Sequence, residues 1–208
     1  MDNNHFDNNH FDNNYFHAMY RGSDDPWGFT TRWYEERKYH LTLAALPKRR
    51  YRNAFEAGCS IGVFTELLAH RCDKLLTVDL SARATSIAAE RLEPFADRVE
   101  VQTRDFVADW PTGTFDLIVL SEVLYYLDPA QFDAVVEQSR QSLAEDGHLV
   151  AVHWRRKVEE YPTSGDRVHE LLSQADLPHV AGYRDGDFLL DIYSSTAGQT
   201  AAELEGLV

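Results

Sequence analysis

The chain alternates short apolar runs with stretches that carry apolar residues at helical spacing. The run at residues 115–120, Phe-Asp-Leu-Ile-Val-Leu, is almost continuously apolar, which indicates a strand buried on both faces. Buried strands that alternate with helices form a parallel sheet with helices on both sides. The alternation therefore predicts an open, doubly wound α/β sheet in a single domain.

The expected elements give this sheet seven strands. One helix is expected from about residue 32 to residue 46, where Pro47 would end it. The other helices are expected around Phe64, Leu67 and Leu68; around Ala84, Ile87, Ala88 and Leu92; around Phe132, Val135, Val136 and Leu143, with Gly147 beyond the helix end; and around Val168, Leu171, Leu172 and Ala175. The strands are expected at residues 53–56, 75–78, 99–101, 115–120 and 148–152, followed by an antiparallel hairpin of residues 180–184 and 188–193.

The two ends of the chain differ from this pattern. The first sixteen residues repeat a pentapeptide, Asp-Asn-Asn-His-Phe, whose third copy has Tyr in place of His. Such short units cannot stack as a solenoid, and their composition predicts a disordered arm over residues 1–16. His5 and His10 could bind a metal, but no further ligands accompany them at a defined spacing. Residues 17–194 are expected to form the domain, with 17–47 as an N-terminal flap and 195–208 as a flexible tail.

Charge and composition restrict the partners. The chain has 20 Lys and Arg against 34 Asp and Glu, a net charge of −14, which disfavours nucleic acid and anionic membranes. No apolar run is long enough to span a membrane, and the two cysteines, Cys59 and Cys72, form neither a disulfide framework nor a zinc motif. We expect a cytoplasmic protein that acts on a small molecule without a metal ion.

A glycine-containing turn, Glu56-Ala57-Gly58-Cys59-Ser60-Ile61-Gly62, joins the first strand to the next helix. Gly58 would allow a tight turn, and Gly62 would allow a ligand to approach the start of the helix. The spacing differs from the Gly-x-Gly-x-x-Gly that places a pyrophosphate at a helix N-terminus. Glu56 would repel a phosphate and attract an ammonium group, unless it is an ordinary surface carboxylate.

Asp79 ends the second strand, where a carboxylate in such sheets binds both hydroxyls of a ribose. The alternative is that Asp79 caps the following helix. A ligand with a ribose, no phosphate and a cationic amino-acid end fits Glu56, Gly58 and Asp79 together. S-adenosylmethionine has these features, so we expect it to be the cofactor.

These segments resemble the class I S-adenosylmethionine-dependent methyltransferases, through residues 56–62, 78–79, 105–106 and 115–122. The chain is more specifically similar to NodS-type methyltransferases, over roughly residues 16–193, in residues 25–27, 33–35, 55–62, 120–127 and 153–155. The resemblance implies a Rossmann-like methyltransferase fold. That family N-methylates the freed amine of a chitooligosaccharide.

The resemblance also implies roles for cofactor-binding residues. Asp79 would hold the ribose, Gly58 the methionine end, and Leu80 the adenine or ribose. Asp105 and Phe106 would contact the edge and the face of the adenine, although Asp105 can also be an ordinary loop carboxylate. The other residues expected around the cofactor are Glu56, Cys59, Gly62, Ser121, Trp27 and Trp33.

Methyl transfer is an in-line displacement that requires alignment and exclusion of water, and an amine acceptor must also lose a proton. Glu122 directly follows the buried strand, and His153 ends the fifth strand on the same side. We expect these two residues to orient or deprotonate the nucleophile. The alternatives are a helix-start carboxylate for Glu122 and a structural histidine for His153, and His169 is a further candidate.

Aromatic and basic residues precede the first strand. Trp27, Trp33 and Tyr34 can attract a sulfonium cation and form a flap over it, or they can pack a helix on the sheet. Arg37 and Lys38 are either partners of the cofactor carboxylate or part of a solvated helix face.

The sequence thus predicts an S-adenosylmethionine-dependent methyltransferase acting on a small-molecule amine such as an amino sugar. An O-methyltransferase of a hydroxyl or carboxyl metabolite is the nearest alternative. A nicotinamide or flavin oxidoreductase is a second class, although Thr65 stands where its third glycine would be. A catalytically silent cofactor-binding protein is a third.

Overall fold

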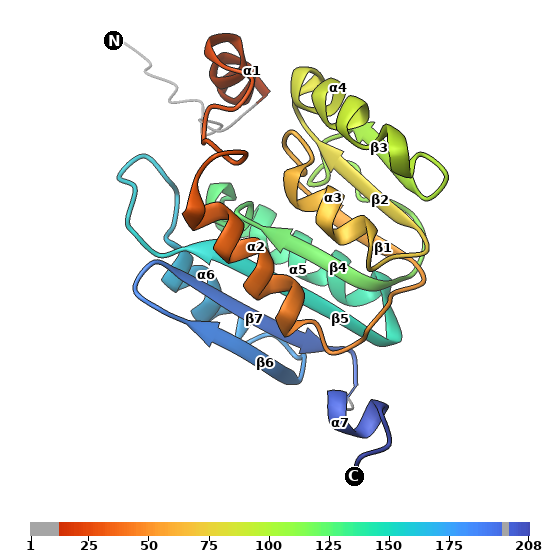
Figure 1. Cartoon of the computed structure of the whole chain (residues 1–208). Coiled ribbons are helices and arrows are strands. Elements are labelled where there is room, and N and C mark those ends of the chain that lie inside the picture. Colours follow the sequence, from red (N-terminus) through yellow and green to blue (C-terminus); the bar gives the residue numbers. More distant parts are fainter. Residues whose placement is uncertain (1–12, 197–199) are drawn as a thin grey trace.

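One seven-stranded sheet organises the protein, with the strand order β3-β2-β1-β4-β5-β7-β6 (Figure 1). The computed structural model describes residues 13–196 and 200–208. The strands are β1 (Ala54–Ala57), β2 (Leu75–Asp79), β3 (Val99–Thr103), β4 (Phe115–Ser121), β5 (Leu143–Trp154), β6 (His179–Arg184) and β7 (Phe188–Ser194). Strands β1 to β5 are parallel, and β7 runs antiparallel to both β5 and β6. The predicted fold class, including the antiparallel C-terminal hairpin, is confirmed.

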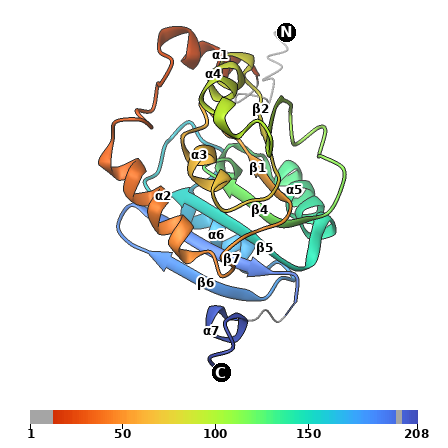
Figure 2. The same ribbon diagram turned by 45° about the vertical axis from the view of Figure 1, so that its right-hand side comes forward.

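Helices cover both faces of this sheet. The helices are α1 (Asn13–Gly22), α2 (Trp33–Ala45), α3 (Val63–Ala69), α4 (Ala82–Arg91), α5 (Pro129–Ser142), α6 (Gly165–Leu172) and α7 (Ala201–Leu204), with 3-10 turns η1 (Glu93–Phe95) and η2 (Leu124–Tyr126). Figures 1 and 2 show α2, α3 and α4 on one face and α5 and α6 on the other. Each face has its own apolar core, as expected for a sheet whose central strands are apolar on both sides.

The strand order reverses between β1 and β4, which lie side by side in the middle of the sheet. Ala57 at the end of β1 pairs with Leu120 near the end of β4, so the loops that follow these strands separate at this edge. Helix α3 then covers one face and α5 the other. Open α/β sheets bind their ligands at such a point, outside the carboxyl ends of the strands.

The fifth strand begins earlier than the sequence suggested. Leu143, expected on the preceding helix, is the first residue of β5 and pairs with Phe115, and Gly147 lies within the strand. The register between β4 and β5 shifts between Phe115 and Leu117, which accommodates the additional residues. A single leucine fits both a helical and a strand period, so periodicity alone could not place this boundary. Ala175 similarly lies beyond α6, which ends at Leu172.

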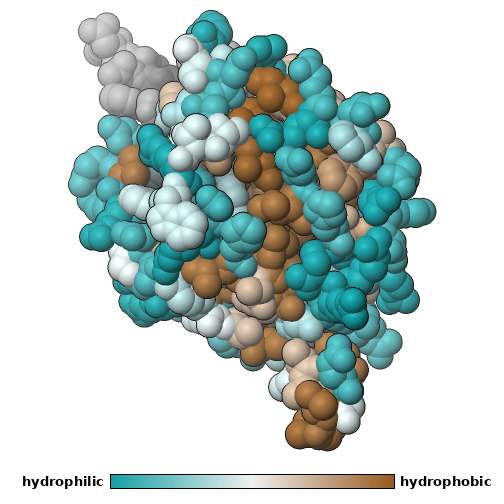
Figure 3. Space-filling view, in the orientation of Figure 1, coloured by the Kyte–Doolittle hydropathy of each residue, from teal (hydrophilic) through white to brown (hydrophobic). Residues whose placement is uncertain are grey.

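The chain ends also differ from the expected boundaries. Residues 13–16, expected in the arm, belong to α1, and the Phe16 ring packs edge-on against Tyr126 at 5.2 Å. Residues 1–12, with His5 and His10, lie outside the described residues. Within the expected tail, α7 begins at a capping box, and Leu204 and Leu207 are exposed. Figure 3 shows apolar side chains gathered at the C-terminal end of the molecule. In the described part of the chain, no helix has the length and apolarity needed to cross a bilayer.

Candidate active site

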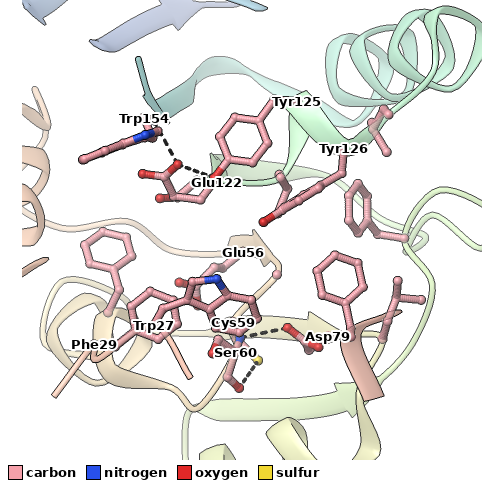
Figure 4. Close-up of a pocket in the computed structure, with 18 of the residues that line it drawn as sticks. Trp27, Phe29, Glu56, Cys59, Ser60, Asp79, Glu122, Tyr125, Tyr126 and Trp154 are labelled. Atoms are coloured by element: carbon pink, nitrogen blue, oxygen red, sulfur yellow. Dashed lines mark hydrogen bonds between the residues drawn. The ribbon is translucent and has the colours of Figure 1, made fainter. Parts of the chain in front are cut away.

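A cavity of about 1070 Å³ lies at the carboxyl ends of β1, β2, β3 and β4 (Figure 4). Helices α1 and α2 and the loop between them supply part of its lining, and the loop after β5 supplies another part. The cavity brings together most of the residues predicted for a site: Trp27, Glu56, Gly58, Cys59, Asp79, Leu80, Asp105, Phe106, Ser121 and Glu122. These residues come from five separate segments of the chain.

The turn after β1 is held against β2. The amides of Gly58 and Cys59 both donate to the carbonyl of Val78, at 2.8 and 2.9 Å. Gly58 has a φ of +78°, and a Cβ at this position would lie 2.4 Å from the Val123 side chain. A glycine is therefore required both for the left-handed backbone and for the close approach of the segment after β4.

Asp79 lies at the end of β2 and is anchored by two backbone amides. Its Oδ2 accepts a hydrogen bond from the amide of Ser60 at 2.9 Å, and its Oδ1 accepts one from the amide of Ser81 at 2.9 Å. A carboxylate has about four lone-pair positions, so each oxygen can accept another donor. Burial raises the pKa of Asp79 above its usual value, against the lowering effect of these two amides. The arrangement suits a pair of vicinal hydroxyls.

Glu56 is a buried carboxylate on β1. The hydroxyls of Thr65 and Thr77 both donate to its Oε2, at 2.7 and 2.8 Å. No group among the described residues donates a hydrogen bond to its Oε1. Burial raises the pKa of Glu56 to about 7. A cationic donor in the cavity would satisfy the open oxygen and stabilise the ionised form.

Aromatic residues of the N-terminal segment cover this side of the cavity. Trp27 stacks on Phe29 with ring centroids 5.6 Å apart, and Tyr20 contacts the edge of Trp27. The hydroxyl of Tyr20 also forms a 2.5 Å hydrogen bond with Ser60 Oγ, in the turn after β1. Phe106, in the segment that follows β3, is buried and provides an apolar wall. A ligand bound here would be largely shielded from water.

Glu122 occupies the other side of the cavity, directly after β4 (Figure 4). Its Oε1 accepts a hydrogen bond from Lys38 Nζ at 2.6 Å. Its Oε2 accepts one from Tyr125 Oη at 2.7 Å and one from the amide of Trp154 at 2.9 Å. Glu122 also has a φ of +59°, which is uncommon for a residue with a side chain. The surrounding contacts hold this strained residue in one orientation.

Lys38 is a buried cation that connects α2 to this carboxylate. Its Nζ lies 2.6 Å from Glu122 and 2.9 Å from Glu35, and the side chain is 2% exposed. Burial lowers the pKa of Lys38, but the two carboxylates outweigh this effect and raise the pKa above its usual value. Lys38 therefore remains charged and balances part of the negative charge beside the cavity.

The comparisons with known proteins place the chain in a family. The sequence profile of the NodS family, described as Nodulation protein S, matches residues 16–161. The chain belongs to the NodS family. Nodulation protein S of Sinorhizobium fredii is 34% identical over 140 residues, which cover 64% of this chain and 63% of that protein. The Rhizobium tropici protein is 35% identical over 130 residues, which cover 62% and 54%. The chain thus spans less than two thirds of these curated relatives.

A solved structure of the family supports the same assignment. The N-methyltransferase NodS from Bradyrhizobium japonicum WM9, in complex with S-adenosyl-L-homocysteine, is 29% identical to this chain. The match covers 88% of this chain and 98% of that one, with a TM-score of 0.78. The resemblance expected from the sequence motifs is therefore confirmed.

Two residues predicted for the cofactor site of this NodS family member lie elsewhere. Gly62 has a φ of +77°, but a Cβ there would contact Ala88 and Leu92, so this glycine permits the packing of α3 against α4. Trp33 is 68% exposed and does not line the cavity. Helix α2 turns Tyr34 and Lys38, four residues apart, toward the cavity, which leaves Trp33 on the outer side.

His153 does not line the cavity either. Its side chain is fully buried beneath η2, where its Nε2 accepts a hydrogen bond from the Leu124 amide at 3.2 Å. Its Nδ1 lies 3.1 Å from Nε2 of His169. Burial is the main cause that lowers the pKa of His153 well below its usual range, and the neighbouring His169 and Lys38 lower it further. His153 has no access to a substrate, so the prediction that it acts directly on the nucleophile was wrong.

The sequence reasoning missed the actual partners of Lys38. Lys38 pairs with Glu35 and Glu122. Arg37 instead binds Tyr183 on β6 at 2.6 Å and Asp185, in the turn after β6, at 2.8 Å. The i, i+3 spacing of Glu35 and Lys38 was a usable signal for one of these pairs. The pair of Lys38 with Glu122, which lies 84 residues further along the sequence, had no sequence signal.

Proposed function

We propose that this protein is an S-adenosylmethionine-dependent methyltransferase that methylates the nitrogen of a small-molecule amine. The observation that carries the proposal is a single cavity in which Asp79 can accept both hydroxyls of a ribose and Glu56 offers an open oxygen to an ammonium group. Neither carboxylate suits a pyrophosphate, which disfavours a dinucleotide. The similar NodS protein that binds S-adenosyl-L-homocysteine supports the same cofactor here.

The proposed cofactor-binding residues divide along the length of the ligand. Asp79 holds the ribose, and Leu80, Asp105 and Phe106 surround the adenine. The methionine end is proposed to lie against Glu56, Gly58, Cys59 and Ser121, beneath Trp27. When bound, the sulfonium supplies an activated methyl carbon. The aromatic cover excludes water, which would otherwise compete for the methyl group.

The amine is proposed to bind beside Glu122. Three donors already occupy the carboxylate, and one lone-pair position on Oε1 remains for a proton of the amine. The lone pair of the neutral nitrogen attacks the methyl carbon, so a nitrogen–carbon bond forms while the carbon–sulfur bond breaks and leaves its electron pair on sulfur. The methylated ammonium then loses one proton to water as the product leaves. Glu122 thereby orients the nucleophile and stabilises its positive charge.

Two measurements test this function. Calorimetry should detect binding of S-adenosylhomocysteine and none of NAD; binding of NAD alone would overturn the cofactor assignment. Methyl transfer is then measured with glucosamine and N-acetylglucosamine, which differ only at the nitrogen. We expect transfer to glucosamine. Methylation of the acetylated sugar alone would refute the amine assignment and favour an O-methyltransferase.

We infer a cytoplasmic location for this reaction. Cys59 and Cys72 are both free and buried, and unpaired cysteines are typical of a reducing compartment. The acidic net charge is consistent with a small-molecule acceptor and with the absence of a nucleic-acid partner. An amino sugar is the proposed acceptor class.

A further inference from the structure

The strongest feature outside the cavity is a chain of hydrogen bonds through three strands and one helix. His153 on β5 contacts His169 on α6, and His169 Nδ1 lies 2.6 Å from Oδ2 of Asp191 on β7. The other oxygen of Asp191 accepts a hydrogen bond from Nε2 of His179 on β6 at 2.7 Å. His153 and His169 are buried, and the His179 side chain is half exposed. This series of hydrogen bonds thus runs from the protein surface to the buried side of η2.

The hydrogen bond from the Leu124 amide to His153 determines which atom is the donor in each of the other hydrogen bonds. The Leu124 amide can only donate, so Nε2 of His153 carries no proton. A neutral His153 then carries its proton on Nδ1 and donates to Nε2 of His169. His169 must in turn carry its proton on Nδ1 and donate to Asp191. The rings of His153 and His169 are therefore each restricted to the tautomer with its proton on Nδ1.

The inner end of this chain lies directly behind the proposed amine site. Leu124 is two residues from Glu122 and adjacent to Tyr125, whose hydroxyl binds Glu122. The ring of His153 also contacts the ring of Tyr125, edge-on at 5.5 Å. The next residue after His153, Trp154, donates its amide to Glu122. The histidine therefore supports both segments that hold the carboxylate.

Gly165 allows helix α6 to pack closely against the end of β5. Gly165 begins α6, and a Cβ there would lie 2.1 Å from the carbonyl oxygen of Trp154 and 3.1 Å from Cβ of His153. Any larger residue would force α6 away from the end of β5. His169 follows four residues later on the same side of the helix, against His153.

We propose that His153 is a positioning residue for methyl transfer, which acts through the Leu124 amide and is fixed in its tautomer by His169 and Asp191. The inference rests on the proposed function. Glu122 has a strained backbone, and small displacements of a reacting group are costly in rate. The histidine chain prevents the segment from Glu122 to Tyr125 from relaxing. The second cavity, which is lined by His169, His179 and Asp191, belongs to the outer end of this chain.

A matched pair of variants separates positioning from core packing. His153→Gln places an amide oxygen where Nε2 stands, so it can still accept from Leu124. His153→Asn reproduces only the Nδ1 side and leaves the Leu124 amide without an acceptor. His148→Asn is the control, because His148 is a buried histidine of the same strand that contacts Tyr51 and lies outside the cavity lining.

With glucosamine as acceptor, we expect His153→Asn to lower kcat by about 10- to 100-fold while the Kd for S-adenosylhomocysteine stays within about twofold. His153→Gln should restore most of the rate, and His148→Asn should leave kcat unchanged. Equal loss in both His153 variants, or a similar loss in His148→Asn, would overturn the proposal.

Nitrogen-15 NMR of the wild-type histidines gives a test that needs no acceptor. We expect a protonated Nδ1 and a bare Nε2 in both His153 and His169 at neutral pH, and a Leu124 amide resonance that shifts in His153→Asn and stays in His153→Gln. A proton on Nε2 of His153 would contradict the proposal. If the wild-type protein methylates no acceptor, the proposed function fails, and the NMR result alone decides whether His153 holds Leu124.

Discussion

Two backbone amides fix the carboxylate oxygens of Asp79 at the cavity wall, and each oxygen keeps a lone pair for another donor. We predict that Asp79→Ala weakens binding of S-adenosylhomocysteine by about 1.5–3 kcal/mol, because the ribose hydroxyls lose a charged acceptor. Calorimetry measures the change. Asp73→Ala is the control, since Asp73 is an exposed carboxylate just before the opposite end of the same strand. An unchanged affinity in Asp79→Ala would remove Asp79 from the ribose site.

If Glu56 binds the ammonium group of the cofactor as proposed, the affinity for the cofactor should depend on pH. Burial raises the pKa of Glu56 to about 7, so below this pH an ammonium group must displace a proton from the carboxyl group in order to bind. We predict that affinity for S-adenosylhomocysteine rises with pH up to about 7 and then levels off, with release of a proton on binding. Calorimetry in buffers of different ionisation enthalpy measures that proton.

Glu56→Gln should remove both the pH dependence and the proton release. Methylthioadenosine, which has no amino group, should bind with little dependence on pH. The stability of the fold should depend on pH in the opposite direction from the affinity. Because the pKa of Glu56 is raised in the folded protein, its contribution to the free energy of unfolding falls as pH rises from about 4.5 through 7. Proton uptake on cofactor binding would contradict this role for Glu56.

At the scale of elements, the turn after β1 and the segment after β4 are packed against each other at Gly58 and Val123. We predict that Gly58→Ala lowers the free energy of unfolding by about 2–5 kcal/mol, the sum of a left-handed alanine and an overpacked contact. Adding Val123→Ala should recover the overpacking part and leave the backbone part. Denaturant unfolding of both variants measures the two contributions.

The double variant also tests whether the contact between the two segments is the source of the cost. Among the described residues, the atom nearest to a Cβ at position 58 belongs to the Val123 side chain. If Val123→Ala fails to recover any stability in the Gly58→Ala protein, the contact between the two segments is not the source of the cost.

At the scale of the whole molecule, the net charge of −14 attracts cations toward a cavity that includes several carboxylates. We predict that the KM for glucosamine rises as NaCl is raised from low to physiological concentration, while kcat changes little, because salt screens the long-range attraction. Steady-state kinetics measure both constants. A KM that is independent of salt would show that the field of the protein makes no contribution to capture of the amine.

Much of the fold was predictable because its signals are local. The apolar run of β4 and the helical spacing in α3, α4 and α5 indicate which face of each element is buried. Burying all of these faces together leaves few ways to pack the helices and strands. The start of β5 at Leu143 was not predictable, because one apolar residue satisfies two periods. The positions of Asp79 and Glu56 at the cavity were predictable because the ends of parallel strands have a fixed place in such a sheet.

The sequence by itself thus determined the layered sheet, the edge of the sheet at which the cavity lies, and the two carboxylates that we propose bind S-adenosylmethionine. Only the tertiary structure decided that Lys38 pairs with Glu122, that Trp33 faces outward and that His153 lies behind the wall of the cavity. The reason is physical: these outcomes depend on the rotation of a helix and on contacts between residues up to 84 positions apart. Local patterns in a chain carry no record of such contacts.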